Sequence, residues 1–101
     1  TEKLLSDHSD LAGLYVSGGG ISGVLAGLRA SGRAGSMLVV GHDLMEVTRS
    51  ALLDGTMTLV ISHPLARLAR ETIDGMVRAC AQPGSNQTSI VPFEIYTREN
   101  L

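Results

Sequence analysis

The sequence predicts an α/β fold in which strands and helices alternate in the order βαβαβαβ. Two observations carry this prediction: short apolar runs have the length of strands, and the segments between them repeat apolar residues at helical spacing. Glycine-rich or polar breaks follow these runs where a strand would end. Because consecutive strands joined by helices pair in parallel through right-handed crossovers, we expect a three-layer parallel sheet.

The length and composition of the chain exclude several classes of protein. Its 101 residues make one domain at most, and an aromatic content of 3% leaves aliphatic residues and methionine to build the core. A net charge of −2 predicts no basic surface for nucleic acid or for an anionic membrane. The lone Cys80 excludes an internal disulfide, and no apolar run approaches the roughly 18 residues of a membrane span.

The first half of the chain contains a βαβ unit around a glycine loop. An apolar strand over Leu11–Val16 ends in Ser17–Gly20, and a helix with one apolar stripe follows over Ile21–Ala30. Gly32 is placed to end this helix in the left-handed conformation, and Met37–Val40 forms the second strand. Ligand sites of open parallel sheets lie at the carboxyl ends of strands, which here are the glycine loop and the polar tip after the second strand.

The second half continues the alternation. Asp43 and Glu46 have the spacing of a capping box, which predicts that Asp43 opens a helix reaching Leu53. Pro64 suits the first position of a further helix that runs to Cys80. Two strands and a loop complete the prediction: the strands Met57–Ser62 and Ile90–Tyr96, the latter with Val91, Phe93 and Ile95 on one face, and the loop Gln82–Ser89.

The helix that follows Pro64 has an apolar stripe that a folded chain must cover. Leaving it wet forfeits about 1.5–3 kcal/mol for each large side chain, which exceeds what a chain of this size can spare. We therefore expect the helix to fold back on its own sheet or to be buried against a second copy. Leu4 and Leu5 look like the end of a helix whose beginning is missing, so we also expect a fragment of a longer chain. The stripe consists of Leu65, Leu68, Ala69, Ile73, Met76, Val77 and Cys80.

Two patterns at the predicted strand ends are typical of functional sites, one of a dinucleotide-binding site and one of an acid–base pair. Gly18, Gly20 and Gly23 satisfy G-x-G-x-x-G between a strand and a helix, and Asp43 ends the next strand, as in a dinucleotide site. Three adjacent glycines also produce this pattern by chance, and a tight turn explains them equally well. His42 and Asp43 could form an acid–base pair, but adjacent residues at a strand end point in different directions, and capping of the next helix also explains Asp43.

His63 ends the third predicted strand, at the same sheet edge as the first two tips, and is either a loop histidine or a ligand contact. Nothing in the sequence resembles a nucleophile with its base, a metal cluster or a P-loop lysine. We therefore expect no catalytic residue, no metal and no cofactor. The expected ligand contacts are Ser17, Gly18, Gly19, His42, Asp43 and His63.

These blocks together resemble a known family. The chain is similar to the carboxyl-terminal third of the LacI-type transcription regulators and of the periplasmic sugar-binding proteins that share their type I fold. The resemblance covers about Leu4–Leu101, and the order and spacing of the blocks carry it. The blocks are Ser17-Gly18-Gly19-Gly20, Val39-Val40-Gly41-His42-Asp43, Ile61-Ser62-His63-Pro64 and Arg98-Glu99-Asn100-Leu101.

The resemblance implies roles for individual residues. Asp43 matches the aspartate that accepts hydrogen bonds from sugar hydroxyls. Ser17 stands where the family has a ligand-binding asparagine, and His63 where it has a glutamine. The Gly-Gly-Gly sequence departs from the usual first tip, so backbone N–H groups would replace side chains there. The family's regulators dimerise through this subdomain, which implies self-association through the helices Ile21–Ala30 and Leu44–Leu53.

Three functions stay open. The leading one is the sugar- or polyol-binding effector domain of a cytoplasmic, dimeric LacI-type regulator, which would bind DNA through a helix-turn-helix domain absent from this chain and would contact no membrane. The second is the periplasmic sugar-binding protein of an ABC transporter. The third is a nicotinamide-dinucleotide-binding half-domain of an oxidoreductase. The free Cys80 and the lack of an export signal favour the cytoplasm.

Overall fold

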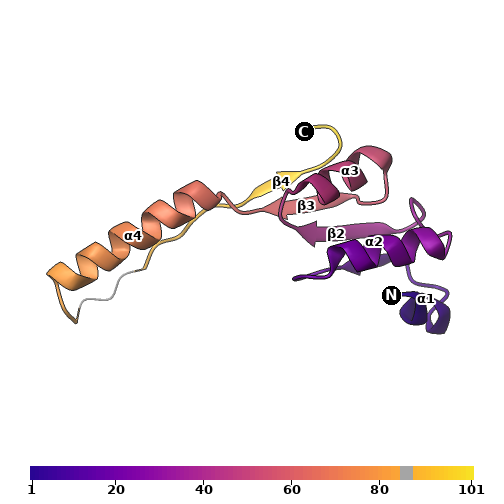
Figure 1. The fold of residues 1–101 in the computed structure, drawn as a ribbon, viewed down its shortest axis with the longest axis horizontal. Coiled ribbons are helices and arrows are strands. Elements are labelled where there is room, and N and C mark those ends of the chain that lie inside the picture. The colour runs from indigo at the N-terminus through magenta and orange to yellow at the C-terminus, as the bar shows by residue number, and fades with distance from the viewer. Residues whose placement is uncertain (85–87) are drawn as a thin grey trace. The chain divides into compact units, whose positions relative to one another are not determined.

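The computed structural model describes residues 1–84 and 88–101, which form two compact units. The first unit comprises Thr1–Ser62 and Ile95–Leu101, and the second comprises His63–Glu94 (Figure 1). The middle of the predicted loop Gln82–Ser89 lies outside the described residues. Each unit is described by itself.

The first unit confirms the α/β class and the alternating order. In the described chain the sheet has the strand order β1-β2-β3-β4, and β1, β2 and β3 pair in parallel. The predicted helix Ile21–Ala30 is found with the same bounds, and Gly32 after it has the expected left-handed φ of +68°. The elements are α1 (Glu2–Asp7), β1 (Gly13–Tyr15), α2 (Ile21–Ala30), β2 (Leu38–His42), α3 (Glu46–Asp54), β3 (Leu59–Ser62) and β4 (Glu94–Tyr96).

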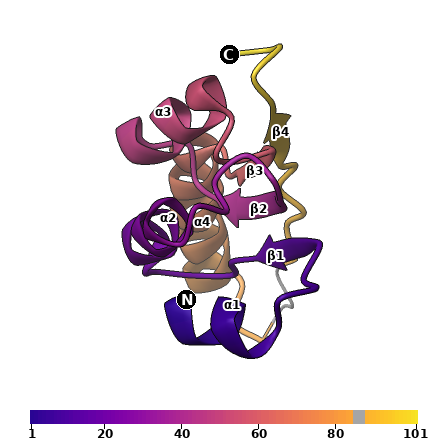
Figure 2. The same cartoon turned by 90° about the vertical axis from the view of Figure 1, so that its right-hand side faces the viewer.

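The core of the first unit lies between one face of the sheet and the helices α2 and α3, which lie on the same side of the strands (Figure 2). Residues paired across the strands share a face, so Val39 of β2 and Val60 of β3 point to the helices and are buried. On the opposite face Tyr15 and Leu38 stay exposed, so this unit supplies two of the three expected layers. The buried core residues are Leu5, Ile21, Leu25, Leu28, Met37, Val39, Ala51, Leu52, Met57 and Val60.

Close contacts and polar links tie the helices to this core. Gly41 of β2 lies so near the core that a Cβ there would be 2.8 Å from Cε of Met57. Arg29 at the end of α2 forms an ion pair of 3.1 Å with Asp54 at the end of α3. Hydrogen bonds from Thr56, and then the Arg29 guanidinium, hold the pKa of the Asp54 carboxyl below its usual value.

The prediction that Asp43 caps the second helix is wrong. Helix α3 begins at Glu46, its N-cap is Met45, and the Thr48 hydroxyl accepts a hydrogen bond of 2.8 Å from the Met45 backbone N–H. The same hydroxyl donates to the Asp43 carbonyl at 2.7 Å. Thr48 is fully buried and satisfies both groups, so the helix does not need the Asp43 side chain as its cap.

Three predicted strands are longer than the observed ones: β3 covers Leu59–Ser62 of the predicted Met57–Ser62, and the two edge strands differ more. β1 covers only Gly13–Tyr15 of the predicted Leu11–Val16, and β4 only Glu94–Tyr96 of the predicted Ile90–Tyr96. Residues 88–93 are described as irregular chain, so Val91 and Phe93 do not form a strand face with Ile95. Apolar alternation by itself does not make a strand, because a strand needs a partner at the right register.

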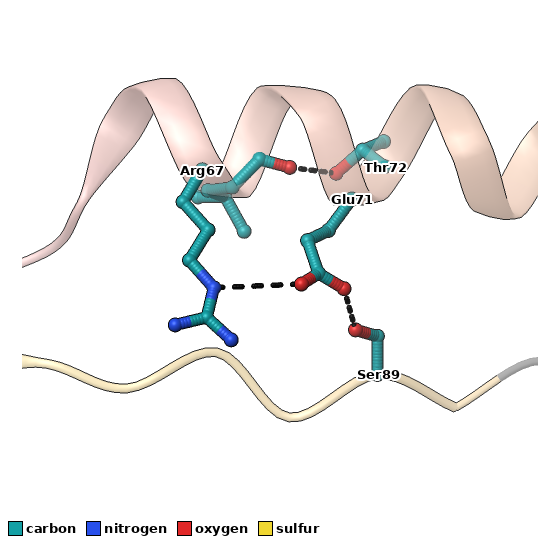
Figure 3. Close-up of polar contacts among 5 residues, drawn as sticks. Arg67, Glu71, Thr72 and Ser89 are labelled. Atoms are coloured by element: carbon teal, nitrogen blue, oxygen red, sulfur yellow. Dashed lines mark hydrogen bonds and ion pairs between the residues drawn. The ribbon is translucent and has the colours of Figure 1, made fainter.

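The second unit is the helix α4 (Leu65–Ala81) with the chain that returns along it. Arg67 pairs with Glu71 one turn later at 3.4 Å, and Glu71 also accepts a hydrogen bond from the Ser89 hydroxyl (Figure 3). The Ser89 hydroxyl and then the Arg67 guanidinium lower the pKa of the Glu71 carboxyl. The Thr72 hydroxyl donates to the Leu68 carbonyl at 2.7 Å, so α4 satisfies this side chain within itself.

The apolar stripe of α4 is exposed within the second unit. Leu65, Leu68, Ile73 and Met76 are 69, 42, 61 and 64% exposed. These fractions describe the second unit by itself, and burial of the stripe on the sheet of the same chain stays a prediction. Burial against a second copy, or against further parts of a longer chain, stays a prediction.

Candidate functional site

The carboxyl ends of β1 and β2 border a hollow of about 480 Å³ in the first unit. Its volume lies within the range of small-molecule pockets, which is about 300–1,000 Å³. The loop after β1 forms one wall and the tip of β2 the other, as expected for a parallel sheet. The lining residues are Ser17, Gly18, Gly19, Gly20, Ile21, Ser22, His42, Asp43 and Met45. The structure thus brings together five of the six predicted contacts.

The glycine loop leaves this wall without side chains. A Cβ at Gly18, Gly19 or Gly20 would meet no atom within 4 Å. Only Gly20, with φ of +88°, has a backbone conformation that favours glycine. Glycine at positions 18 and 19 is therefore not required by packing or by backbone geometry, and its effect is to keep the hollow open.

The loop ends where α2 begins. Gly20 is the N-cap of α2, and in the described chain no side chain makes a capping hydrogen bond there. The first N–H groups of a helix have no partner within the helix. At this end they are available to acceptor oxygens of a ligand in the hollow, together with the N–H groups of the loop.

The third glycine of the G-x-G-x-x-G pattern does not have the role that a dinucleotide site gives it. In such sites this glycine allows close packing between the helix and a strand. Gly23 is exposed in α2, and a Cβ there would meet no atom within 4 Å. The pattern is present in the sequence, but the packing that explains its third member is not.

Asp43 reaches the hollow through an unusual backbone conformation. Its φ of +70° is the one positive value of a non-glycine residue within residues 1–84 and 88–101. Its N–H donates to the Ile61 carbonyl at 2.8 Å, and its carbonyl accepts from Thr48, so the backbone is held on both sides. The side chain is exposed, and no helix cap occupies the carboxylate. Positive φ outside glycine is concentrated at functional sites.

His42 is paired with a residue of the neighbouring strand. Its Nε2 lies 2.5 Å from the Tyr15 hydroxyl, and the two rings meet edge to face with centroids 5.5 Å apart. Nε2 of His42 is thus engaged by Tyr15, and a His42–Asp43 acid–base pair stays a hypothesis. His42 is half-buried, and the exposed Tyr15 adjoins a second hollow of about 420 Å³ that shares Ser17–Gly19.

His63 is not among the residues that line the hollow. It follows Ser62, the last residue of β3, and it is the first residue of the second unit, where its side chain is exposed. Its role as a ligand contact stays a prediction. Within the described residues no group of three His, Cys, Asp or Glu side chains is placed to hold a metal ion.

Other lining residues were not singled out from the sequence. Ser22 follows the first residue of α2, and Met45 lies two residues after Asp43, so both are close to positions that the sequence did identify. The position of Tyr15 beside His42 depends on the β1–β2 register, in which Tyr15 pairs with Val40. Apolar periodicity contains no signal for this register.

Comparison with known proteins identifies the fold. No family model matches the sequence, and no curated protein matches it significantly. Solved structures that match include the glucose-galactose binding protein GanP from Geobacillus stearothermophilus, with 16% identity, a TM-score of 0.87, and coverage of 98% of this chain and 36% of that one. A protein from Bacteroides fragilis assigned as a LacI transcriptional regulator has 18% identity, a TM-score of 0.77 and coverage of 98% and 34%.

A periplasmic ribose ABC transporter protein from Conexibacter woesei matches with 27% identity, a TM-score of 0.70 and coverage of 97% and 34%. The chain therefore has the fold of type I periplasmic sugar-binding proteins and LacI-type regulators, and it spans about a third of the length of these structures. Among the described helices, none is long and apolar enough to cross a membrane.

Proposed function

We propose that this chain is the carboxyl-terminal part of a sugar-binding domain, and that it binds a sugar or polyol in the hollow at the tips of β1 and β2. The observation that carries the proposal is the pairing of an exposed carboxylate, Asp43, with a side-chain-free glycine wall across a hollow of about 480 Å³. The fold supports it, because the matching structures include a glucose-galactose binding protein and a periplasmic ribose ABC transporter protein.

The chemistry of the hollow suits a ligand with many hydroxyl groups. A hydroxyl both donates and accepts, so it needs acceptors and donors on the protein. Asp43 offers acceptor oxygens, while the loop and the first turn of α2 offer backbone N–H donors. The Ser17 hydroxyl and the His42 ring line the same space and can do either. The hollow is thus lined by both hydrogen-bond donors and hydrogen-bond acceptors.

Isothermal titration calorimetry of the full-length natural protein with a panel of pentoses, hexoses and polyols tests this proposal. We expect saturable binding of at least one member. Gly19→Leu should abolish it by filling the hollow while leaving stability unchanged, because no atom lies within 4 Å of the added Cβ. Gly23→Ala is the matched control: it also enters open space, but in α2 outside the lining, and should keep wild-type affinity. Equal loss in both variants, or no binding of any sugar by the wild type, contradicts the proposal.

We further propose that the protein is the effector-binding part of a cytoplasmic LacI-type regulator, which acts as a homodimer and binds DNA through a domain absent from this chain. The LacI-assigned neighbour and the exposed apolar residues Val47 and Leu53 of α3 support this reading. Sedimentation of the full-length protein at micromolar concentration should show a dimer. Selection of bound sequences from random duplex DNA should yield a palindromic site whose affinity changes with sugar.

The periplasmic sugar-binding protein of an ABC transporter is the alternative, favoured by the likeness to GanP and to the ribose transporter protein. It predicts a monomer that binds sugar and no DNA. A nicotinamide-binding half-domain predicts instead that NADH fluorescence changes on titration, and the open surroundings of Gly23 oppose it.

A further inference from the structure

Tyr15 and His42 lie on the same face of the sheet because of the strand register. Tyr15 pairs with Val40, and His42 is two residues further along β2. Side chains two residues apart in a strand point the same way. The two rings are therefore diagonal neighbours, which places the Tyr15 hydroxyl against Nε2 of His42 at 2.5 Å.

Only one of the two rings lines the candidate sugar site. His42 lines the hollow at the tips of β1 and β2, whereas Tyr15 lines the neighbouring hollow, which shares Ser17–Gly19 with the first. Tyr15 can thus influence a ligand in the first hollow through His42. The hydrogen bond to Tyr15 and the edge-to-face packing, with 68° between the ring planes, both restrain the imidazole.

We propose that Tyr15 is a positioning residue for His42 in the sugar site, an inference that rests on the proposed function. The phenol is a better donor than a neutral imidazole N–H, and the imidazole nitrogen is a better acceptor than the phenol oxygen, so the Tyr15 hydroxyl donates to Nε2. Nδ1 then carries the proton. The pair fixes both the orientation and the tautomer of the one ring that lines the hollow, so little ordering of that ring remains when a ligand binds.

A double-mutant cycle with an NMR readout tests the proposal on the full-length natural protein. Tyr15→Phe removes the hydroxyl and keeps the ring packing. It should weaken the affinity for the best-binding sugar of the panel about 2- to 10-fold, which corresponds to the net free energy of one hydrogen bond. In a His42→Ala background, Tyr15→Phe should cause no further loss, because Tyr15 acts through His42.

Long-range ¹H–¹⁵N spectra of histidine-labelled protein at pH 8 report the tautomer directly. We expect His42 in the Nδ1–H form in the wild type and a shift toward the Nε2–H form in Tyr15→Phe. Tyr96→Phe, which removes a hydroxyl from β4 next to the core, is the matched control and should change neither the tautomer nor the affinity.

Any one of four results overturns the positioning role. Unchanged sugar affinity in Tyr15→Phe excludes any role of the hydroxyl in binding. Equal losses with and without His42 show that Tyr15 contacts the ligand itself. A wild-type Nε2–H tautomer refutes the direction of the hydrogen bond. If the tautomer shifts as expected but the wild type binds no sugar, the pair is real and the proposed function is what fails, together with this role for Tyr15.

Discussion

Replacing Asp43 by glycine should separate the stability of this chain from its binding of sugar. The left-handed backbone at Asp43, with φ of +70°, costs an L-residue about 1–2 kcal/mol, although aspartate tolerates it better than most. Glycine avoids this cost but loses about 0.5–1 kcal/mol more backbone entropy on folding. The difference predicts that Asp43→Gly raises the free energy of unfolding by about 0–1.5 kcal/mol.

The same substitution removes the carboxylate from the hollow. A hydrogen bond to a charged group contributes about 1.5–3 kcal/mol, so sugar affinity should fall about 10- to 150-fold. Asp43→Asn and Asp43→Ala complete the series. Asparagine keeps the tolerance of the left-handed conformation and loses the charge, whereas alanine loses both. We expect stability in the order Gly, then wild type and Asn, then Ala, with weakened sugar binding in all three variants.

Urea unfolding followed by circular dichroism measures the stabilities, and titration calorimetry with the best-binding sugar measures the affinities. A glycine variant that unfolds at lower urea than the alanine variant would refute the backbone argument. Unchanged affinity across the series would remove Asp43 from the site. The prediction on stability and the prediction on sugar binding are therefore tested independently.

Three further predictions concern the packing and the charges. Gly41→Ala should lower the free energy of unfolding by about 1 kcal/mol in urea titrations, because its Cβ would force the flexible end of Met57 to move. The pKa of Asp54 is lowered on folding, so its carboxylate stabilises the chain at neutral pH, and this contribution is lost as the pH falls through the lowered pKa. The urea midpoint of Asp54→Asn should therefore lie below that of the wild type at pH 7. The difference between the two midpoints should narrow below about pH 4. Leu52→Ala in the core should cost about 2–5 kcal/mol and Leu65→Ala on α4 less than about 0.5 kcal/mol; a large loss for Leu65→Ala, measured in the same way, would show that α4 is covered in solution.

The helices α2 and α4 follow from local sequence. The period of apolar residues and a glycine after the end located α2 at Ile21–Ala30. α4 begins one residue after Pro64, its predicted first position, and ends one residue beyond Cys80. These signals are local because each turn of a helix bonds to the next turn of the same segment. The edge strands were less well predicted, since β1 and β4 are limited by where a neighbouring strand offers partners.

The candidate site was also predicted in part from the sequence and decided in part by the tertiary structure. Alternation of strands and helices was enough to bring Ser17–Gly19, His42 and Asp43 to one hollow, because parallel strands all end at the same edge of the sheet. The sequence also suggested that Asp43 would cap α3. Only the tertiary structure showed that the buried Thr48 takes over the start of the helix and leaves the carboxylate exposed.

The Tyr15–His42 pair was decided by tertiary structure alone, and the sequence does not specify what covers the apolar stripe of α4. The pair depends on the register between two strands, which a shift of one residue would destroy by turning each side chain to the other face. The stripe is visible in the sequence as a surface that needs a partner, but a pattern of apolar residues does not specify which surface covers it, because the hydrophobic effect has no direction. Hydrogen bonds within a helix join residues that are close in the sequence. The register between strands and the burial of an apolar face depend instead on segments that are far apart in the sequence.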